Sequence, residues 1–140
     1  MYELNCEAAF DSAHFLTDYY GKCENLHGHR WRVEVTIQAD ELQTEGTMKG
    51  MVYDFGEFKK VVRDVCKRFD HMFLVEEGSL KPETLACLES EGFHLLVLPF
   101  RTTAENLACH IASILTEEFG LAVTCVEVDE TPNNRAFWRK

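Results

Sequence analysis

The segment CENLHGHRWRVEVTIQA, residues 23–39, joins a pair of histidines to a β-strand pattern. From Trp31 to Ala39 apolar residues alternate with polar ones, which is typical of a strand with one buried face. His27 and His29 are two residues apart, so on extended backbone their side chains lie on the same side. Two adjacent imidazoles can chelate one metal ion, and zinc commonly takes nitrogen ligands. The segment therefore predicts a half-buried strand with a metal site near one end.

A catalytic zinc usually has three protein ligands and an open fourth position, so the histidine pair needs a third partner. His14 is the candidate, at the end of the segment Phe10–His14. A His-Gly-His triplet alone would indicate only a polar turn. Cys23 lies four residues before His27 in a polar, glycine-flanked loop, where reactivity explains a thiol better than packing does. We expect Cys23 to face the bound substrate without ligating the ion.

Three further strands are indicated by alternating or apolar patterns. Residues Tyr2–Phe10 alternate and should pair antiparallel with Trp31–Ala39, with the polar loop Asp11–Glu24 between the two strands. Ala122–Val128 and Arg135–Arg139 are predicted as the last two strands. The strands thus fall into one pair at each end of the chain.

Two amphipathic helices lie between the strand pairs. Asp54 is a predicted N-cap, and apolar residues then recur at helical spacing as far as Phe69. The second helix opens with a capping box at Thr102 and ends at Phe119, before Gly120. The order strand-strand-helix-helix-strand-strand predicts an α+β fold, an antiparallel sheet with two helices on one face.

The stretch between these helices is mixed. A short helix is possible near Pro82–Leu88, and Leu95–Leu98 is a predicted short strand. With 140 residues, the chain suits a single domain covering 1–140.

Charge and composition exclude several classes of protein. The formal net charge of −10 argues against a general nucleic-acid-binding protein. No segment reaches the roughly 20 apolar residues of a membrane span, and the amino terminus lacks a signal sequence, so we expect a cytoplasmic protein. In the cytoplasm the six cysteines stay reduced. Five lie in apolar-patterned segments and are predicted core residues: Cys6, Cys66, Cys87, Cys109 and Cys125.

Several motifs, in this order, resemble the family of 6-pyruvoyl-tetrahydropterin synthase and 6-carboxy-tetrahydropterin synthase. They cover the chain from end to end: Phe10-Asp11-Ser12-Ala13-His14, Cys23-x-x-x-His27-Gly28-His29, Gly50-Met51-Val52-Tyr53-Asp54-Phe55, Asp70-His71, Thr102-Thr103-Ala104-Glu105-Asn106 and Glu130-Thr131. The resemblance implies the tunnelling fold, in which sheets from several subunits close into a barrel, usually in a homohexamer with active sites between subunits.

The resemblance also implies a role for each motif. Zinc would be bound by His14, His27 and His29, and would polarise the substrate oxygens. Cys23 would be the general base, since a nearby zinc or imidazolium lowers the pKa of a thiol. Asp70 and His71 would form a proton relay, in which the carboxylate orients the ring. Glu130 would bind the aminopyrimidine edge of a pterin through two N–H donors. Glu105 could contact the pterin as well, although it fits the capping box of Thr102 equally.

The function implied is that of a zinc-dependent lyase converting 7,8-dihydroneopterin triphosphate to 6-carboxy-5,6,7,8-tetrahydropterin, with release of acetaldehyde and triphosphate, for queuosine biosynthesis. The spacing of Cys23 and His27 favours this product over 6-pyruvoyl-tetrahydropterin, the first alternative. Glu24 leaves open a second alternative, because folate-pathway relatives use a glutamate in place of the cysteine and cleave the side chain. A non-catalytic metal-binding or pterin-binding module is an alternative of another class. The residues Met72–Val75 and Glu76–Phe93 depart from the family pattern.

A triphosphate needs cationic partners that oppose the negative net charge of the chain. The candidates are Arg30, Lys49, Lys59 and Arg101, and the sequence does not choose between them. His94 and His110 match no motif and are predicted to be structural.

Overall fold

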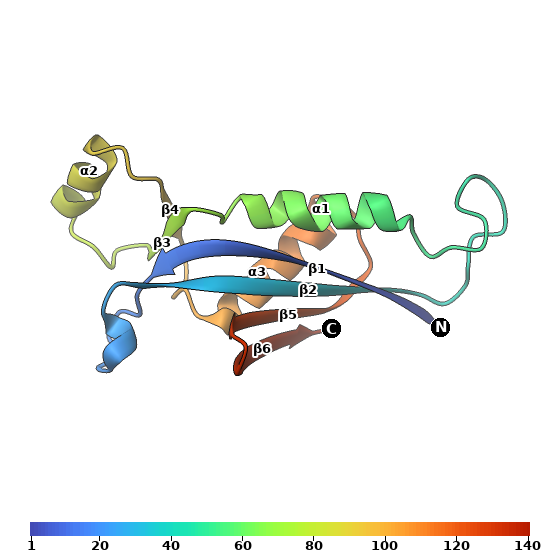
Figure 1. Ribbon diagram of the computed structural model, residues 1–140, viewed down its shortest axis with the longest axis horizontal. Helices are drawn as coiled ribbons and strands as arrows, with labels where there is room; N and C mark the ends of the chain where they lie inside the picture. Colours follow the sequence, from blue (N-terminus) through green and yellow to red (C-terminus); the bar gives the residue numbers. More distant parts are fainter.

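The computed structural model describes residues 1–140 and contains six strands, three α-helices and one short 3-10 helix (Figure 1). In chain order these are β1 (Tyr2–His14), η1 (Lys22–Glu24), β2 (His27–Ala39), α1 (Phe55–Lys67), β3 (Met72–Glu76), α2 (Pro82–Ser90), β4 (Leu95–Leu98), α3 (Ala104–Glu117), β5 (Val123–Thr131) and β6 (Asn134–Arg139). None of the helices has the length and apolar character that crossing a membrane requires.

All six strands belong to one curved sheet in the order β4-β3-β1-β2-β5-β6. The four strands β1, β2, β5 and β6 pair antiparallel, as expected. The β1–β2 ladder is the longest and runs from Tyr2 opposite Ala39 to His14 opposite His27. β3 and β4 extend the sheet by parallel pairing beside β1, so the sheet as a whole is mixed.

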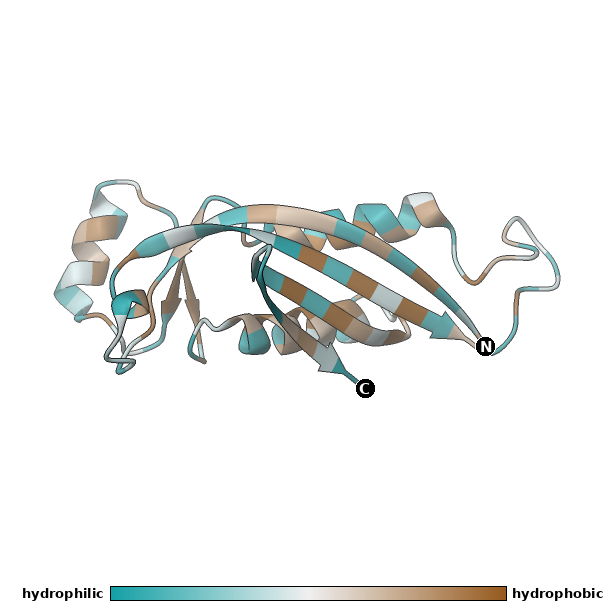
Figure 2. Cartoon of the chain, turned by 60° about the horizontal axis from the view of Figure 1, so that its bottom comes forward, coloured by the Kyte–Doolittle hydropathy of each residue, from teal (hydrophilic) through white to brown (hydrophobic).

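One apolar core lies between the sheet and the helices α1 and α3. Figure 2 shows the alternation of hydrophilic and hydrophobic residues along the long strands. The apolar side of β2 is fully buried at Trp31, Val33 and Val35. It packs with α1 and α3 residues such as Phe58 and Leu107. This burial fixes the register of β2, and therefore fixes which way His27 and His29 point.

Two features of this architecture differ from the sequence prediction. The first two strands extend further than the apolar pattern, because β1 continues through His14 and β2 already begins at His27. The predicted loop Asp11–Glu24 is shorter for that reason. β3 was not predicted, because its five residues lack a clear alternation. The possible short helix near Pro82–Leu88 is present as α2; it buries none of its residues and stands apart from the core in Figure 1.

Two details of the predicted packing are corrected. The N-cap of α3 is Thr103, whose hydroxyl accepts from the Asn106 N–H at 3.3 Å, and not Thr102. Cys87 is exposed because α2 buries none of its residues, and Cys109 is exposed because it lies on the solvent side of α3; only Cys6 and Cys66 are buried core thiols. Burial raises the pKa of Cys66 to about 12 and that of Cys6 to about 11.

Candidate active site

Three histidines converge at the end of the β1–β2 ladder. His14 on β1 is the register partner of His27 on β2, and His29 follows on the same face of β2. One ring nitrogen from each lies within 4.8 Å of the others. The Nε2 atoms of all three are buried and make no hydrogen bond. Paired strands thus bring together residues that the sequence separates, and they leave three imidazole nitrogens facing one another.

Backbone carbonyls fix two of these rings. His14 Nδ1 lies 2.8 Å from the carbonyl oxygen of Thr102, and His27 Nδ1 lies 2.6 Å from that of Asn25. A carbonyl only accepts, so each Nδ1 carries a hydrogen, and in a neutral ring Nε2 then keeps its lone pair. Burial also lowers the pKa of His14 to about 4, which keeps the ring neutral. Neutral imidazole is the form that binds a metal.

The cluster fits a metal ion on its own chemistry. Buried polar nitrogens normally find a partner, and three unpartnered ones at one point are unusual. Three imidazoles facing one point, two of them with their second nitrogen bonded to a carbonyl, are the arrangement seen around catalytic zinc. His14, His27 and His29 could therefore hold a metal ion.

Glu130 lies beside the cluster and Glu105 does not join it. Glu130 is on β5, and its Oε1 is 3.3 Å from His29 Nε2. Burial lowers the pKa of His29, and the carboxylate of Glu130 opposes that shift. Glu105 is exposed in the first turn of α3 and does not line the cavity beside His29. Of the two predicted acids, the fold brings Glu130 to the histidines.

Asp70 and His71 form a pair between α1 and β3. Asp70 Oδ1 accepts from the Asp11 backbone N–H at 2.9 Å, and Oδ2 lies 2.8 Å from His71 Nδ1. These two donors, the backbone N–H first, lower the pKa of Asp70, which keeps it ionised. The ionised carboxylate holds the Nδ1–H tautomer of His71, so Nε2 is free to exchange a proton.

The backbone at His71 is held in an unusual conformation. Its φ is +55°, in the left-handed region that non-glycine residues rarely adopt. The backbone N–H of His71 donates to the carbonyl oxygen of Asp11 at 2.7 Å, which secures this turn. The side chain is 80% exposed. Strained backbone that presents a reactive side chain is typical of functional sites.

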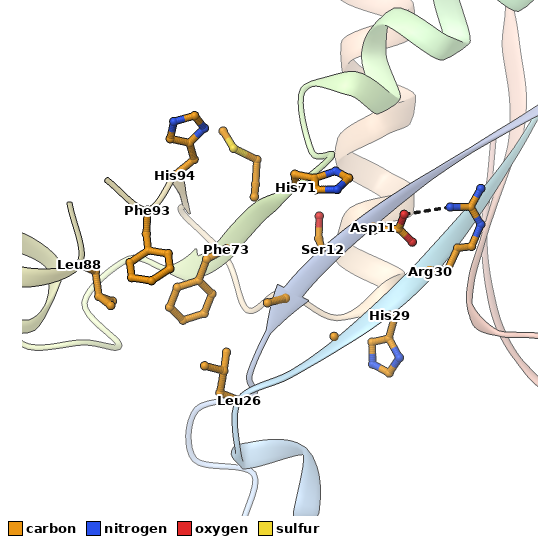
Figure 3. Close-up of a pocket in the computed structure, with 13 residues that line it drawn as sticks. Asp11, Ser12, Leu26, His29, Arg30, His71, Phe73, Leu88, Phe93 and His94 are labelled. Carbon is orange, nitrogen blue, oxygen red and sulfur yellow. Dashed lines mark hydrogen bonds and ion pairs between the residues drawn. The ribbon is translucent and has the colours of Figure 1, made fainter. Parts of the chain in front are cut away.

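A cavity of about 680 Å³ opens in front of His71 (Figure 3). His29, Asp11 and Arg30 line one part of it. The other part is apolar and is formed by Leu26, Phe73, Leu88 and Phe93, with His94 beside them. His94 therefore lies at the cavity and is exposed, where the sequence predicted a structural role. The sequence could not place His94 at the cavity, because His94 lies in the loop before β4 and the neighbouring strand β3 was not predicted.

Cys23 and Glu24 lie in η1, outside that cavity. The carbonyl of Cys23 accepts from the Leu16 N–H at 2.9 Å, and the thiol is partly exposed. Glu24 Oε2 accepts from the Tyr20 N–H at 2.7 Å, and Tyr20 has a φ of +60°. Glu24 thus stabilises the turn before η1. Within one chain Cys23 does not line the cavity that His71 lines.

Of the four cations considered for a triphosphate, only Arg30 lines the cavity. Its Nη1 is 2.9 Å from Asp11 Oδ2 (Figure 3). The guanidinium of Arg101 donates to the Thr17 carbonyl, and so it supports the loop after β1. Lys59 is on the exposed side of α1, and Lys49 is in the loop before that helix.

Known proteins resemble this chain along its whole length. A 6-carboxy-5,6,7,8-tetrahydropterin synthase of Haemophilus influenzae is 35% identical over 136 residues, 96% of each chain. The enzyme of the same name from Rickettsia bellii is 36% identical over 133 residues, 89% of this chain and 90% of its own.

The fold likewise matches a solved structure. The 6-pyruvoyl tetrahydropterin synthase of Plasmodium falciparum superposes with a TM-score of 0.71 at 23% identity, over 99% of this chain and 97% of that one. This likeness confirms the predicted tunnelling-fold architecture. The sequence model of the family described as 6-pyruvoyl tetrahydropterin synthase matches residues 3–140. The chain therefore belongs to the 6-pyruvoyl tetrahydropterin synthase family.

Proposed function

We propose that the protein is a zinc-dependent lyase that converts 7,8-dihydroneopterin triphosphate and water to 6-carboxy-5,6,7,8-tetrahydropterin, acetaldehyde and triphosphate, and that it supplies queuosine biosynthesis in the cytoplasm. The observation that carries the proposal is the cluster of three buried, unpartnered histidine nitrogens. The full-length relatives named 6-carboxy-5,6,7,8-tetrahydropterin synthase support this reaction over others of the family.

His14, His27 and His29 are the proposed zinc ligands. Two of the three already have the tautomer that ligation needs, because carbonyls accept from their Nδ1–H groups. Zinc bound there would act as a Lewis acid toward the hydroxyl and carbonyl oxygens of the substrate side chain. Glu130 lies close enough to His29 to bind the pterin ring while the side chain of the substrate meets the metal. Two N–H donors of the aminopyrimidine would pair with its carboxylate.

Cys23 is the proposed general base, and Asp70 with His71 the proposed proton relay. The thiol of Cys23 is partly exposed in η1, so it can meet a substrate. His71 would exchange protons at Nε2, while Asp70 stays ionised and keeps Nδ1 protonated. Such a relay supplies a proton to one face of the substrate after a base has removed one from another position.

We propose that a complete active site uses two chains. Cys23 is not among the residues around the cavity of His71 in a single chain. The sheet also ends in two edge strands, β4 and β6, whose outer hydrogen-bonding groups have no partner in the chain. Sheet edges are normally covered or closed, and association of chains edge to edge closes them into a barrel. A homohexamer is the proposed assembly.

The alternative activities differ in which side chain, Cys23 or Glu24, acts as the general base. In the 6-pyruvoyltetrahydropterin synthase of Plasmodium vivax, a glutamate is described as a catalytic residue. Glu24 of this chain is engaged with the Tyr20 backbone N–H, which favours Cys23 as the base. A non-catalytic binding module would have no need of the oriented Asp70–His71 pair.

Incubation of the purified protein with 7,8-dihydroneopterin triphosphate tests the proposal. Liquid chromatography with mass detection should show loss of the substrate and formation of a tetrahydropterin, and zinc chelation should abolish both. A protein that binds zinc and leaves the substrate intact over hours would contradict the proposed activity and would favour the non-catalytic module.

A further inference from the structure

The three histidines of the cluster are not restrained in the same way. His14 and His27 each have a backbone carbonyl at Nδ1, at 2.8 Å and 2.6 Å. His29 has no hydrogen bond to either ring nitrogen, and the Glu130 carboxylate is the only charged group in ion-pair contact with it. A ligating histidine usually depends on a partner at its second nitrogen for its orientation. Something else must orient the ring of His29.

Trp31 provides that restraint by packing. It follows His29 by two residues on β2, so both side chains lie on the same face of the sheet. The ring centroids of Trp31 and His29 are 5.1 Å apart at an interplanar angle of 80°. Those of Trp31 and His14 are 5.0 Å apart at 82°. Both contacts have the edge-to-face geometry that aromatic rings prefer.

Trp31 is itself immobilised by the core. The side chain is fully buried. Its ring stacks near Phe10, with centroids 6.0 Å apart and planes 18° apart, and Phe10 in turn contacts Phe69 at 5.3 Å. An aromatic column therefore leads from the histidine cluster into the core. The indole Nε1 has no hydrogen-bond partner, so Trp31 contacts the histidines by packing and not by a hydrogen bond.

We propose that Trp31 is a positioning residue of the histidine cluster, which holds the ring of His29, and secondarily that of His14, in the orientation that binds metal. The proposal rests on the proposed metal site and goes beyond it by assigning the orienting role to a residue that makes no polar contact. The ring of His29 also packs edge-on against the rings of His27 and His14, at 4.8 Å and 5.1 Å between centroids, and Trp31 is its only aromatic neighbour that is not itself a proposed ligand. Loss of the indole would open space beside the ring of His29 and let it turn about its side-chain bonds. The substitution would then weaken metal binding, and this loss can be measured separately from the stability of the fold.

Zinc affinity of Trp31→Leu, measured by competition with a chromogenic chelator, is the test. Removing an orienting partner typically weakens metal binding by about 10–100-fold, and we expect a loss in that range. Trp31→Phe keeps an aromatic ring and should bind more tightly than Trp31→Leu. The matched control is Val35→Ala, which empties a fully buried position on the same face of β2 without removing a contact to a histidine. It should lower the thermal stability of the zinc-free protein and leave the affinity unchanged.

Two results would overturn the proposal: wild-type affinity in Trp31→Leu, or an equal loss of affinity in Val35→Ala.

A second measurement leaves Trp31 in place. In Trp138→Phe protein, Trp31 is the only tryptophan, and one equivalent of Co²⁺ should quench its fluorescence; unchanged emission on Co²⁺ binding would count against the contact. If the wild-type protein binds no zinc, the proposed metal site is refuted. If the wild-type protein binds zinc and Trp31→Leu binds it equally well, only the role of Trp31 is refuted.

Discussion

The carbonyl oxygen of Thr102 lies 2.8 Å from Nδ1 of His14, although 88 residues separate the two in the sequence. The Thr102 hydroxyl lies 3.2 Å from the same nitrogen. This contact ties the segment just before α3 to the end of β1. It also leaves Nε2 of His14 available for a metal, because the proton is held on the other nitrogen.

Removal of any one histidine of the cluster should abolish metal binding. We expect one zinc ion per chain in the wild-type protein and close to none in His14→Ala, His27→Ala or His29→Ala, because two imidazoles hold the ion far less tightly than three. Elemental analysis of dialysed protein measures this. His94→Ala is the control, since that histidine is exposed at the cavity and outside the cluster. Full zinc content in His27→Ala and His29→Ala would show that the ion, if any, binds elsewhere.

The zinc-free protein should lose stability on mild acidification. Burial lowers the pKa of His14 from 6.5 to about 4. Between these values the unfolded chain binds a proton at His14 that the folded chain does not. The stabilisation of the folded state by the neutral ring of His14 is therefore complete above pH 6.5, and it is lost as the pH falls toward 4. For one proton the slope is about 1.4 kcal/mol per pH unit.

Denaturant unfolding at a series of pH values measures that slope. His14→Gln removes the titrating group and keeps an amide near the Thr102 carbonyl, so its stability should depend less on pH in this interval. Identical slopes for the two proteins would mean that the ring of His14 is not buried in the neutral form.

The hydrogen bond of Glu24 changes how its role must be tested. Its carboxylate accepts from the Tyr20 N–H, so Glu24→Ala would disturb the loop whether or not the residue reacts. Glu24→Gln keeps an accepting oxygen and removes the acid. We expect Glu24→Gln to form product at nearly the wild-type rate, whereas Cys23→Ala should lose roughly 10²–10⁴-fold in rate with zinc retained. The reverse pattern, with a side-chain-cleaved hydroxymethyl pterin as product, would assign the chemistry to Glu24.

Subunit mixing tests whether one active site uses two chains. Cys23→Ala and His71→Ala proteins should each be inactive. When the two are unfolded and refolded together, some sites would pair an intact Cys23 with an intact His71 and recover activity. Light scattering of the wild-type protein should show an oligomer, with a hexamer expected. A stable monomer at micromolar concentration, or a mixture that stays inactive while forming mixed oligomers, would place the whole site in one chain.

The parts of the fold that the sequence predicted are those with a strong local signal. Alternation over Trp31–Ala39 and helical periodicity between Asp54 and Phe69 located β2 and α1 to within a few residues. The short strand β3 was not predicted, because five residues carry too little periodicity and its pairing with β1 is set by the tertiary fold. α2 was predicted only as a possible helix, because its residues bury nothing and so show no clear apolar stripe.

For the site, residue types and spacing predicted the histidine cluster, because His27 and His29 share one face of a strand. The contacts that Thr102, Trp31 and Glu130 make with it could not be read from the sequence, although strand alternation placed Trp31 on the same face and the family resemblance placed Glu130 at the site. They depend on strand register and on the placement of α3 and β5 against the sheet. Thr102 illustrates this: its pattern fits a capping residue, yet Thr103 is the cap and Thr102 is buried against His14.

Product identity is the most direct test of the proposed activity. Zinc-loaded wild-type protein would be incubated with 7,8-dihydroneopterin triphosphate, and the pterin, acetaldehyde and triphosphate would be quantified by mass detection, with Cys23→Ala as the control. The proposed reaction predicts 6-carboxy-5,6,7,8-tetrahydropterin and acetaldehyde in equal amounts from the wild-type protein and almost none from the variant. A 6-pyruvoyl product formed without acetaldehyde, or turnover by Cys23→Ala at the wild-type rate, would contradict it.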